Sequence, residues 1–192
     1  MTDATAPGQV GLTHPANVLT IARMVFAPVL FWLVLEADET RGASWAVFSL
    51  GLAMAGTDFL DGRVARRANV VSRSGAFLDP LADKVVILGS AICLVAVERY
   101  WWFPVALIAV RELGITAWRA RWVREGLSIP ARQSAKYKTL VQGVALALAV
   151  FPPLDTADEA VAVALWIAVA FTIVTGIQYV LDRKSALSRT GD

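Results

Sequence analysis

The amino-acid sequence predicts an all-α integral membrane protein with six transmembrane helices and with its N- and C-termini in the cytoplasm. The first reason is composition, because 57% of the residues are hydrophobic, whereas a soluble domain is usually about 45–50% apolar. The second is charge, because basic residues gather in alternate connections between apolar stretches. We expect residues 1–192 to form a single domain, since no repeat, low-complexity tract or linker divides them.

Six apolar stretches are the candidate membrane spans, because a helix needs about 20 mostly apolar residues to cross a bilayer. Some of them contain embedded charges, and the fifth is short and ends at two consecutive prolines. The first follows a polar segment without a basic stretch, so we interpret it as a retained span and not as a signal peptide. The six stretches are 16–35, 44–60, 81–97, 102–122, 139–152 and 160–181.

The basic residues predict the orientation, because cytoplasmic loops carry an excess of lysine and arginine. The second connection, the fourth connection and the C-terminal tail are basic, whereas the first, third and fifth connections are mainly acidic. The sequence therefore predicts a multi-pass protein of the cell membrane that is surrounded by membrane lipids. The run Tyr100-Trp101-Trp102 is typical of an aromatic belt at the outer interface. The net charge is only +2, so we expect no nucleic-acid partner.

Four aspartates lie at the cytoplasmic ends of the second and third apolar stretches. Asp58 and Asp61 are near the end of the second stretch, and Asp79 and Asp83 are at the start of the third. Residues three or four apart share one face of a helix, so each pair presents two carboxylates on one face. Because the connection is short, we expect the two helices to be antiparallel neighbours with their acids on the same side of the membrane.

Small residues accompany both acid pairs. Gly62 and Ala65 continue the face of the first pair, and Gly75 precedes Asp79 by one helical turn. Glycine inside a helix costs about 1 kcal/mol relative to alanine, and close approach of a ligand or another helix would compensate for it. A solvated loop neutralised by nearby arginines is the alternative, but it does not explain these residues or Asp83 at the mouth of an apolar span.

Four carboxylates at one membrane surface require cations. Two like unit charges 4 Å apart repel each other by about 4 kcal/mol at an effective dielectric constant of 20. Oxygen ligands favour magnesium, manganese or calcium over zinc, and the chain has one cysteine and one histidine. The aspartates therefore predict a site for hard divalent cations.

Eight residues of this region match, in type and spacing, the signature of a known family. They form the pattern Asp58-x2-Asp61-Gly62-x2-Ala65-Arg66-x8-Gly75-x3-Asp79-x3-Asp83. This pattern resembles the CDP-alcohol phosphatidyltransferase family. The resemblance implies a six-helix membrane enzyme, usually a homodimer, with a CDP-linked lipid donor and two divalent ions, commonly Mg²⁺ with Mn²⁺ as a possibility.

The same resemblance implies roles for individual residues. The metal ligands would be Asp58, Asp61 and Asp79, with Asp83 as a shared ligand and catalytic general base. The CDP-lipid would lie on Gly62 and Ala65, with Arg66 on the donor phosphate and Gly75 in the same site. Such chemistry needs these residue types, because metals can stabilise the oxygens of the broken phosphoanhydride and a carboxylate can take the proton of the acceptor hydroxyl.

Three further stretches, 17–23, 110–119 and 135–142, resemble the phosphatidylglycerophosphate synthases within that family. This likeness implies CDP-diacylglycerol as donor and glycerol 3-phosphate as acceptor, with phosphatidylglycerophosphate and CMP as products. A phosphorylated acceptor also suits basic residues in or near apolar spans, because a phosphate of charge about −2 favours bidentate arginine contacts. The candidate acceptor-phosphate residues are Arg23, Arg111, Arg119, Lys136 and Lys138.

Three alternatives remain at this stage. A related transferase could use phosphatidylglycerol, as in cardiolipin synthesis, or an inositol phosphate as acceptor. A divalent-cation transporter could also carry acids in membrane spans, but its site should lie near the bilayer midplane. The aspartates cluster at one interface instead, which favours an enzyme whose active site faces the cytoplasm.

Overall fold

The computed structural model describes residues 15–68, 75–124 and 133–190, and within them the side chains of 21–57, 81–118, 121, 137–179 and 181. These residues are all-α, as the sequence predicts. Two short 3-10 helices, η1 and η2, lie in the connections. The elements are α1 (Pro15–Glu36), η1 (Asp38–Thr40), α2 (Trp45–Ala68), α3 (Gly75–Ala96), α4 (Trp102–Arg124), α5 (Gln133–Val150), η2 (Pro152–Leu154) and α6 (Asp158–Thr190).

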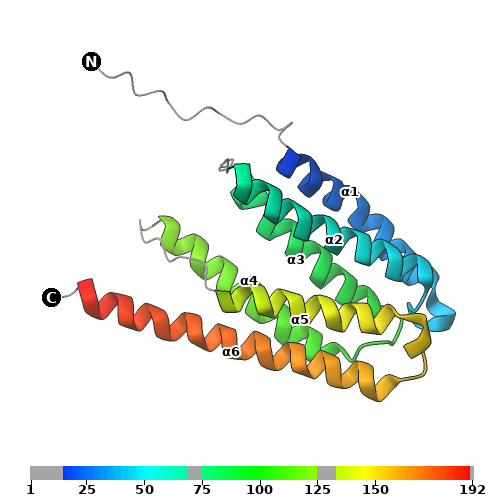
Figure 1. The fold of residues 1–192 in the computed structure, drawn as a ribbon. Coiled ribbons are helices and arrows are strands. Elements are labelled where there is room, and N and C mark those ends of the chain that lie inside the picture. Colours follow the sequence, from blue (N-terminus) through cyan, green and yellow to red (C-terminus); the bar gives the residue numbers. More distant parts are fainter. Residues whose placement is uncertain (1–14, 69–74, 125–132, 191–192) are drawn as a thin grey trace.

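The six helices form an elongated bundle in which consecutive helices run in opposite directions (Figure 1). α2 ends and α3 begins at the same end of the bundle, which we call the acid end. α1 begins and α6 ends there as well (Figure 1). The opposite end, where α3 leads into α4 and α5 into α6, is called the turn end. The prediction that both acid-bearing helix ends lie on one side is therefore confirmed.

Several helices extend beyond the apolar stretches at the acid end. α2 continues to Ala68, α3 already begins at Gly75, and α5 begins at Gln133. The apolar stretches were expected to end at 60 and to begin at 81 and 139. A helix can continue into polar sequence as long as its side chains favour the helical backbone. The alanines and arginines of 61–68 are good helix formers. Both acid pairs therefore lie on helices.

Close helix packing depends on small residues at the contacts. α1 packs mainly against α3 and α2, α5 against α6, and α4 against α6 and α3. At Gly89 of α3, an added Cβ would overlap the ring of Phe31 of α1, so this glycine allows α1 to approach. Among the described residues α2 and α3 contact each other little, whereas α1 and α5 each pack against both. The two acid-bearing helices are thus antiparallel, but direct packing between them is slight because α1 and α5 occupy their buried faces.

The largest buried apolar side chains and most of the buried polar ones lie in different parts of the bundle. Val34, Val47, Leu94 and Val161 are almost fully buried and belong to the helix ends at the turn end. Apart from Arg99 at the turn end, the buried polar residues lie further along the helices, towards the acid end. They are Arg23, Ser90, Glu112, Lys138, Gln142, Thr172 and Thr175.

Large apolar side chains also cover the outside of the bundle, with exposed examples on every helix. Trp101 and Trp102 are exposed at the turn end, as expected for an aromatic belt. Tyr100 is not part of that belt. Its ring is buried and its hydroxyl donates a 2.8 Å hydrogen bond to the carbonyl oxygen of Ala145, because the turn between α3 and α4 directs it into the bundle.

Within the part of the chain whose side chains are described, one helical stretch is long and apolar enough to cross a membrane. It covers 158–179 of α6 and has a mean hydropathy of 2.4. Shorter apolar helical stretches are found at 45–57 and 137–150. In α1 and α3 the described side chains cover only 21–36 and 81–96.

Candidate active site

The four predicted metal-binding aspartates lie on the two helices that meet the acid end. Asp58 and Asp61 belong to the last turns of α2, and Asp79 and Asp83 to the first turns of α3. Their backbones therefore have the helical spacing that places each pair on one face. The side chains of 58–80 lie outside the described residues, as do those of the predicted CDP-lipid residues Gly62, Ala65, Arg66 and Gly75, so the convergence of the four carboxylates stays a prediction.

Of the four predicted metal-binding aspartates, Asp83 is the one whose side chain is described. Its carboxylate contacts Arg23 of α1. The Nη1 of Arg23 donates to Oδ1 of Asp83. The arginine side chain is 6% exposed, whereas that of Asp83 is 36% exposed. The pair therefore neutralises Arg23 inside the bundle and leaves the carboxylate accessible from outside. It brings a predicted general base together with a predicted phosphate-binding residue.

No group of three or more histidine, cysteine, aspartate or glutamate side chains that could hold a metal occurs among the described side chains. Three of the four predicted ligands lie outside that part of the chain. The chemistry of the predicted donor set still fits Mg²⁺ or Mn²⁺, because it consists of carboxylate oxygens alone.

A second group of charges joins α4 to α5, and we call Arg111, Glu112 and Lys138 the charged cluster. Nη1 of Arg111 donates to Oε1 of Glu112 over 2.9 Å. Nζ of Lys138 donates to the same oxygen. Glu112 and Lys138 are buried, and the Arg111 side chain is only 13% exposed. Two residues predicted to bind the acceptor phosphate thus share one carboxylate.

The charged cluster carries an excess of positive charge. Two cations, Arg111 and Lys138, share the single carboxylate of Glu112. Desolvating an unbalanced charge is expensive, and it is tolerated when an additional counter-ion is bound. The arrangement therefore suits an anionic ligand.

Helix α6 completes the surroundings of Arg111. Its Nη2 donates to Oγ1 of Thr175 over 2.9 Å. Its Nε is buried without a hydrogen-bond partner. A Cβ added at Gly176 would lie 3.2 Å from this Nε. One turn closer to the turn end, Nε2 of Gln142 donates to Oγ1 of Thr172 over 2.9 Å.

The remaining two residues predicted to bind the acceptor phosphate are Arg119 and Lys136. Arg119 lies two turns beyond Arg111 on α4, towards the acid end, and Lys136 lies in the first turn of α5. Their side chains are outside the described residues. Their backbones are on the two helices that carry the charged cluster, so their role in the same site stays a prediction.

A different arginine network closes the turn end. Arg99 follows α3, and its side chain is 0% exposed. Its Nε donates to the carbonyl of Ala149 over 3.0 Å, and Nη1 donates to the carbonyl of Asp155 over 2.5 Å. Nη2 donates to the carbonyl of Leu154, and Nη1 also contacts Oδ1 of Asp158 at 2.9 Å. Arg99 therefore satisfies backbone carbonyls that the end of α5 and η2 leave without helical partners.

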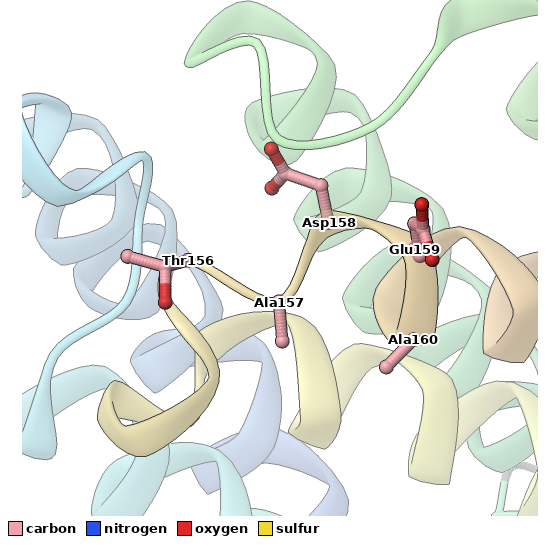
Figure 2. A pocket seen from close by; sticks show the side chains of 5 residues that line it. All are labelled: Thr156, Ala157, Asp158, Glu159 and Ala160. Atoms are coloured by element: carbon pink, nitrogen blue, oxygen red, sulfur yellow. The ribbon is translucent and has the colours of Figure 1, made fainter.

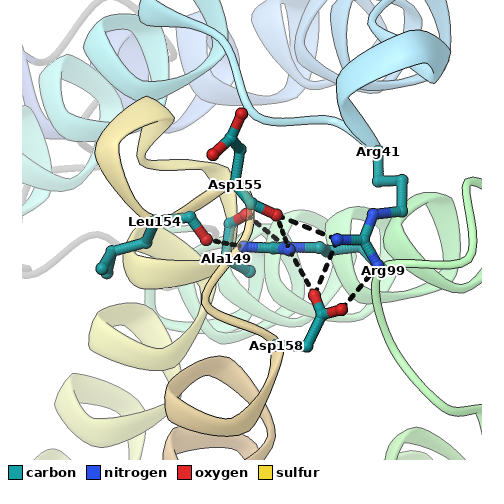
Figure 3. A network of polar contacts seen from close by, with 6 residues as sticks. All are labelled: Arg41, Arg99, Ala149, Leu154, Asp155 and Asp158. Atoms are coloured by element: carbon teal, nitrogen blue, oxygen red, sulfur yellow. Dashed lines mark hydrogen bonds and ion pairs between the residues drawn. The ribbon is translucent and has the colours of Figure 1, made fainter.

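Arg41 joins the same network from the connection between α1 and α2. Its Nη2 and Nη1 contact the two oxygens of Asp158 at 2.7 and 3.1 Å. Figure 3 shows both guanidinium groups converging on Asp158 and on the carbonyl of Asp155. Burial lowers the pKa of Arg99, and the neighbouring charge of Arg41 lowers that pKa further.

A shallow depression lies next to this network, at the first turn of α6 (Figure 2). Its lining residues are Thr156, Ala157, Asp158, Glu159 and Ala160. The Asp158 carboxylate in it is held by the arginines. The depression is at the turn end, far along the bundle from the acids, and its residues do not include any of those predicted to act.

Sequence analysis did not identify the residues with which α6 surrounds Arg111. Thr172, Thr175 and Gln178 recur every three residues within an otherwise apolar stretch. This spacing places them near one helical face, and that polar face is the signal that could have indicated a buried site. The sequence also gave no role for Glu112, because Lys138, which donates to the same carboxylate oxygen as Arg111, is distant in sequence.

Comparison with known proteins identifies the family of the chain. The family model for CDP-alcohol phosphatidyltransferase matches residues 13–174. A probable phosphatidylglycerophosphate synthase of Mycobacterium tuberculosis H37Rv is 36% identical over 177 residues, which cover 90% of this chain and 83% of that protein.

Two other relatives are named CDP-diacylglycerol–glycerol-3-phosphate 3-phosphatidyltransferase. The protein of Escherichia coli K12 is 36% identical over 182 residues, and that of Bacillus subtilis 168 is 30% identical over 191 residues. Each alignment covers 89% of this chain and 95% of the relative. The family match spans all four aspartates and the charged cluster, so the chain belongs to the CDP-alcohol phosphatidyltransferase family, whose members are membrane-bound transferases of phospholipid biosynthesis.

Proposed function

We propose that the protein transfers the phosphatidyl group of CDP-diacylglycerol to glycerol 3-phosphate, with phosphatidylglycerophosphate and CMP as products. One observation carries the choice of acceptor. In the charged cluster, two cations, Arg111 and Lys138, share the one carboxylate of Glu112, which leaves an excess of positive charge among these three residues. A phosphomonoester of charge about −2 would balance this excess, whereas an uncharged alcohol would not. The names of the relatives support the same acceptor.

In the proposed reaction, the free primary hydroxyl of glycerol 3-phosphate attacks the phosphorus that carries diacylglycerol. An oxygen–phosphorus bond forms there, and the phosphoanhydride bond to CMP breaks. Asp83 accepts the hydroxyl proton as general base. Its contact with Arg23 supports this role, because the contact orients a carboxylate that is accessible from outside the bundle, as a general base must be.

The other acids would bind the metal ions that this chemistry requires. Asp58, Asp61, Asp79 and Asp83 would hold two divalent ions, Mg²⁺ or Mn²⁺, through oxygen atoms alone. When bound, such ions neutralise charge on the attacking and leaving oxygens of a displacement. Asp83 would belong to both the metal site and the proton-transfer step.

The donor and the acceptor would occupy neighbouring parts of the same site. On α2, Gly62 and Ala65 would leave room for the cytidine nucleotide, and Arg66 would contact a donor phosphate, with Gly75 of α3 in the same CDP-lipid site. The acceptor phosphate would lie nearer the middle of the bundle. Its proposed contacts are Arg23, Arg111, Arg119, Lys136 and Lys138.

We further propose that the six helices form one domain that crosses the cell membrane six times, with the acid end and both termini in the cytoplasm. Exposed large apolar side chains on every helix support lipid contact, since water-facing surfaces rarely carry such extensive apolar areas. The basic residues of the even connections support the orientation. The family resemblance supports a homodimer.

CMP release tests the proposed reaction. Purified full-length protein receives CDP-diacylglycerol and Mg²⁺, and then glycerol 3-phosphate, glycerol, phosphatidylglycerol or an inositol phosphate in separate reactions. We expect rapid CMP release with glycerol 3-phosphate and loss of release when a chelator removes Mg²⁺. Preference for phosphatidylglycerol or inositol phosphate would replace the acceptor, and absence of CMP with every acceptor would overturn the enzyme assignment. Divalent-ion uptake into vesicles would then test the transporter alternative.

A further inference from the structure

The Arg111 side chain is held by a neighbouring helix, α6, as well as by its own helix. Within α4, Glu112 accepts from Nη1. From α6, Thr175 accepts from Nη2. The Thr175 hydroxyl itself has a 2.8 Å contact to the carbonyl of Phe171. Because its hydrogen can be donated to that carbonyl, a lone pair remains directed at Arg111.

Gly176 provides the space in which this side chain lies. A Cβ at that position would be 3.2 Å from Nε and 3.4 Å from Cγ of Arg111. The distance to Nε is shorter than an ordinary van der Waals contact, so a larger residue at 176 would require the arginine to shift away from α6. At several other described helical glycines, such as Gly143 of α5, an added Cβ would meet no atom within 4 Å. The requirement for glycine at 176 therefore comes from Arg111.

We propose that Thr175 and Gly176 are positioning residues for the acceptor. They fix the Arg111 guanidinium so that its remaining Nη hydrogens can bind the phosphate of the incoming alcohol. This inference rests on the proposed function, in which Arg111 contacts that phosphate. It adds α6 to the acceptor site, although α6 carries none of the residues in the family signature.

The physical reason is preorganisation. A free arginine side chain has many rotamers, and ordering it on binding would weaken the interaction with the ligand. An arginine that is already held by Thr175 and Glu112 has lost this freedom before the phosphate arrives. Removal of the Thr175 acceptor should thus weaken acceptor binding more than it alters the chemical step.

The test compares Thr175→Val, Thr175→Ser and Gly176→Ala with Gly143→Ala as the matched control. The KM for glycerol 3-phosphate and the KM for CDP-diacylglycerol are measured separately on folded, purified protein. We expect Thr175→Val and Gly176→Ala to raise the acceptor KM by about three- to tenfold with little change in the donor KM. Thr175→Ser, which keeps the hydroxyl, and Gly143→Ala should resemble the wild type.

An Arg111→Ala background and a direct binding measurement separate this inference from the proposed reaction. If Thr175 acts through Arg111, Thr175→Val should add no further increase in acceptor KM to that variant. Titration with inorganic phosphate should show weaker binding by Thr175→Val than by Thr175→Ser, whichever acceptor the enzyme uses. Unchanged acceptor KM and unchanged phosphate affinity in both Thr175→Val and Gly176→Ala would overturn the inference. Failure of the wild type to use glycerol 3-phosphate would instead overturn the proposed reaction.

Discussion

Arg99 and Arg111 are both largely buried, but their environments differ in a way that distinguishes a structural arginine from a candidate ligand-binding one. Arg99 donates to three backbone carbonyls and contacts one carboxylate. Arg111 donates to one carboxylate and one hydroxyl, and its Nε has no partner. The N–H groups of Arg99 are therefore used mainly to hold the fold together. Arg111 has further N–H groups with which it could bind a ligand.

The charges around the two arginines differ as well. At the turn end, Arg41 and Arg99 share Asp158, which is largely exposed and can be compensated by solvent. In the charged cluster, Glu112 is buried with Arg111 and Lys138 and accepts from both cations. Charges inside the bundle lack such solvent compensation. In the proposed function, the phosphate of the acceptor would bind beside these two cations.

The largest expected effect concerns the acid end. Asp83→Asn should lower the rate of CMP release by about 10²- to 10⁴-fold, because an amide cannot act as general base. The amide also leaves the buried charge of Arg23 uncompensated, so the unfolding temperature should fall, and the rate is measured on protein that is shown to be folded. Asp38→Asn, at an exposed acid of the turn end, is the control and should keep full activity. Wild-type rates in Asp83→Asn would exclude the carboxylate from proton transfer.

The second effect concerns the turn end. Arg99→Met leaves the carbonyls of Ala149, Leu154 and Asp155 without this donor, and each unsatisfied buried group costs about 1–3 kcal/mol. We expect an unfolding temperature lower by roughly 6–12 °C in detergent, for a loss of about 3 kcal/mol. Both substrate KM values of the protein that remains folded should be unchanged. A raised acceptor KM with normal thermal stability would contradict the structural role of Arg99.

Arg111→Ala should show the reverse pattern. Loss of a charge-assisted contact of about 1.5–3 kcal/mol raises the KM for glycerol 3-phosphate by about ten- to a hundredfold. The KM for CDP-diacylglycerol should change much less, because the donor is proposed to lie on α2 and α3. Steady-state kinetics with each substrate varied in turn measures both constants. A selective rise in the donor KM would move Arg111 to the donor site.

The smallest effect is expected for Arg41→Gln. Arg41 is about one-third exposed and its partner Asp158 is more exposed still, and surface ion pairs contribute about 0–1 kcal/mol. Thermal unfolding at low and high salt should therefore show a small loss of stability that disappears as salt rises. A loss as large as that of Arg99→Met would mean that the two arginines form one cooperative unit.

Much of the fold and part of the site could be predicted from local patterns. Apolar stretches of membrane-spanning length predicted six helices, and the spacing of the aspartates placed each pair on a helical face. These features depend on residues within a few positions of one another, and the helices α2 and α3 confirm them. The helix ends could not be predicted as well, because backbone hydrogen bonding continues into polar sequence where the apolar signal has stopped.

The partners of the buried charges were decided by tertiary structure. Sequence alone determined that Arg111 and Asp83 are charged residues within apolar stretches and that Lys138 directly precedes one. It did not determine that Glu112 joins Arg111 to Lys138, that Arg23 contacts Asp83, or that Gly176 makes room for Arg111. Except for Arg111 and Glu112, which are adjacent, these contacts join residues of different helices. Their geometry depends on how the helices are rotated and packed against one another, and no local pattern records that rotation.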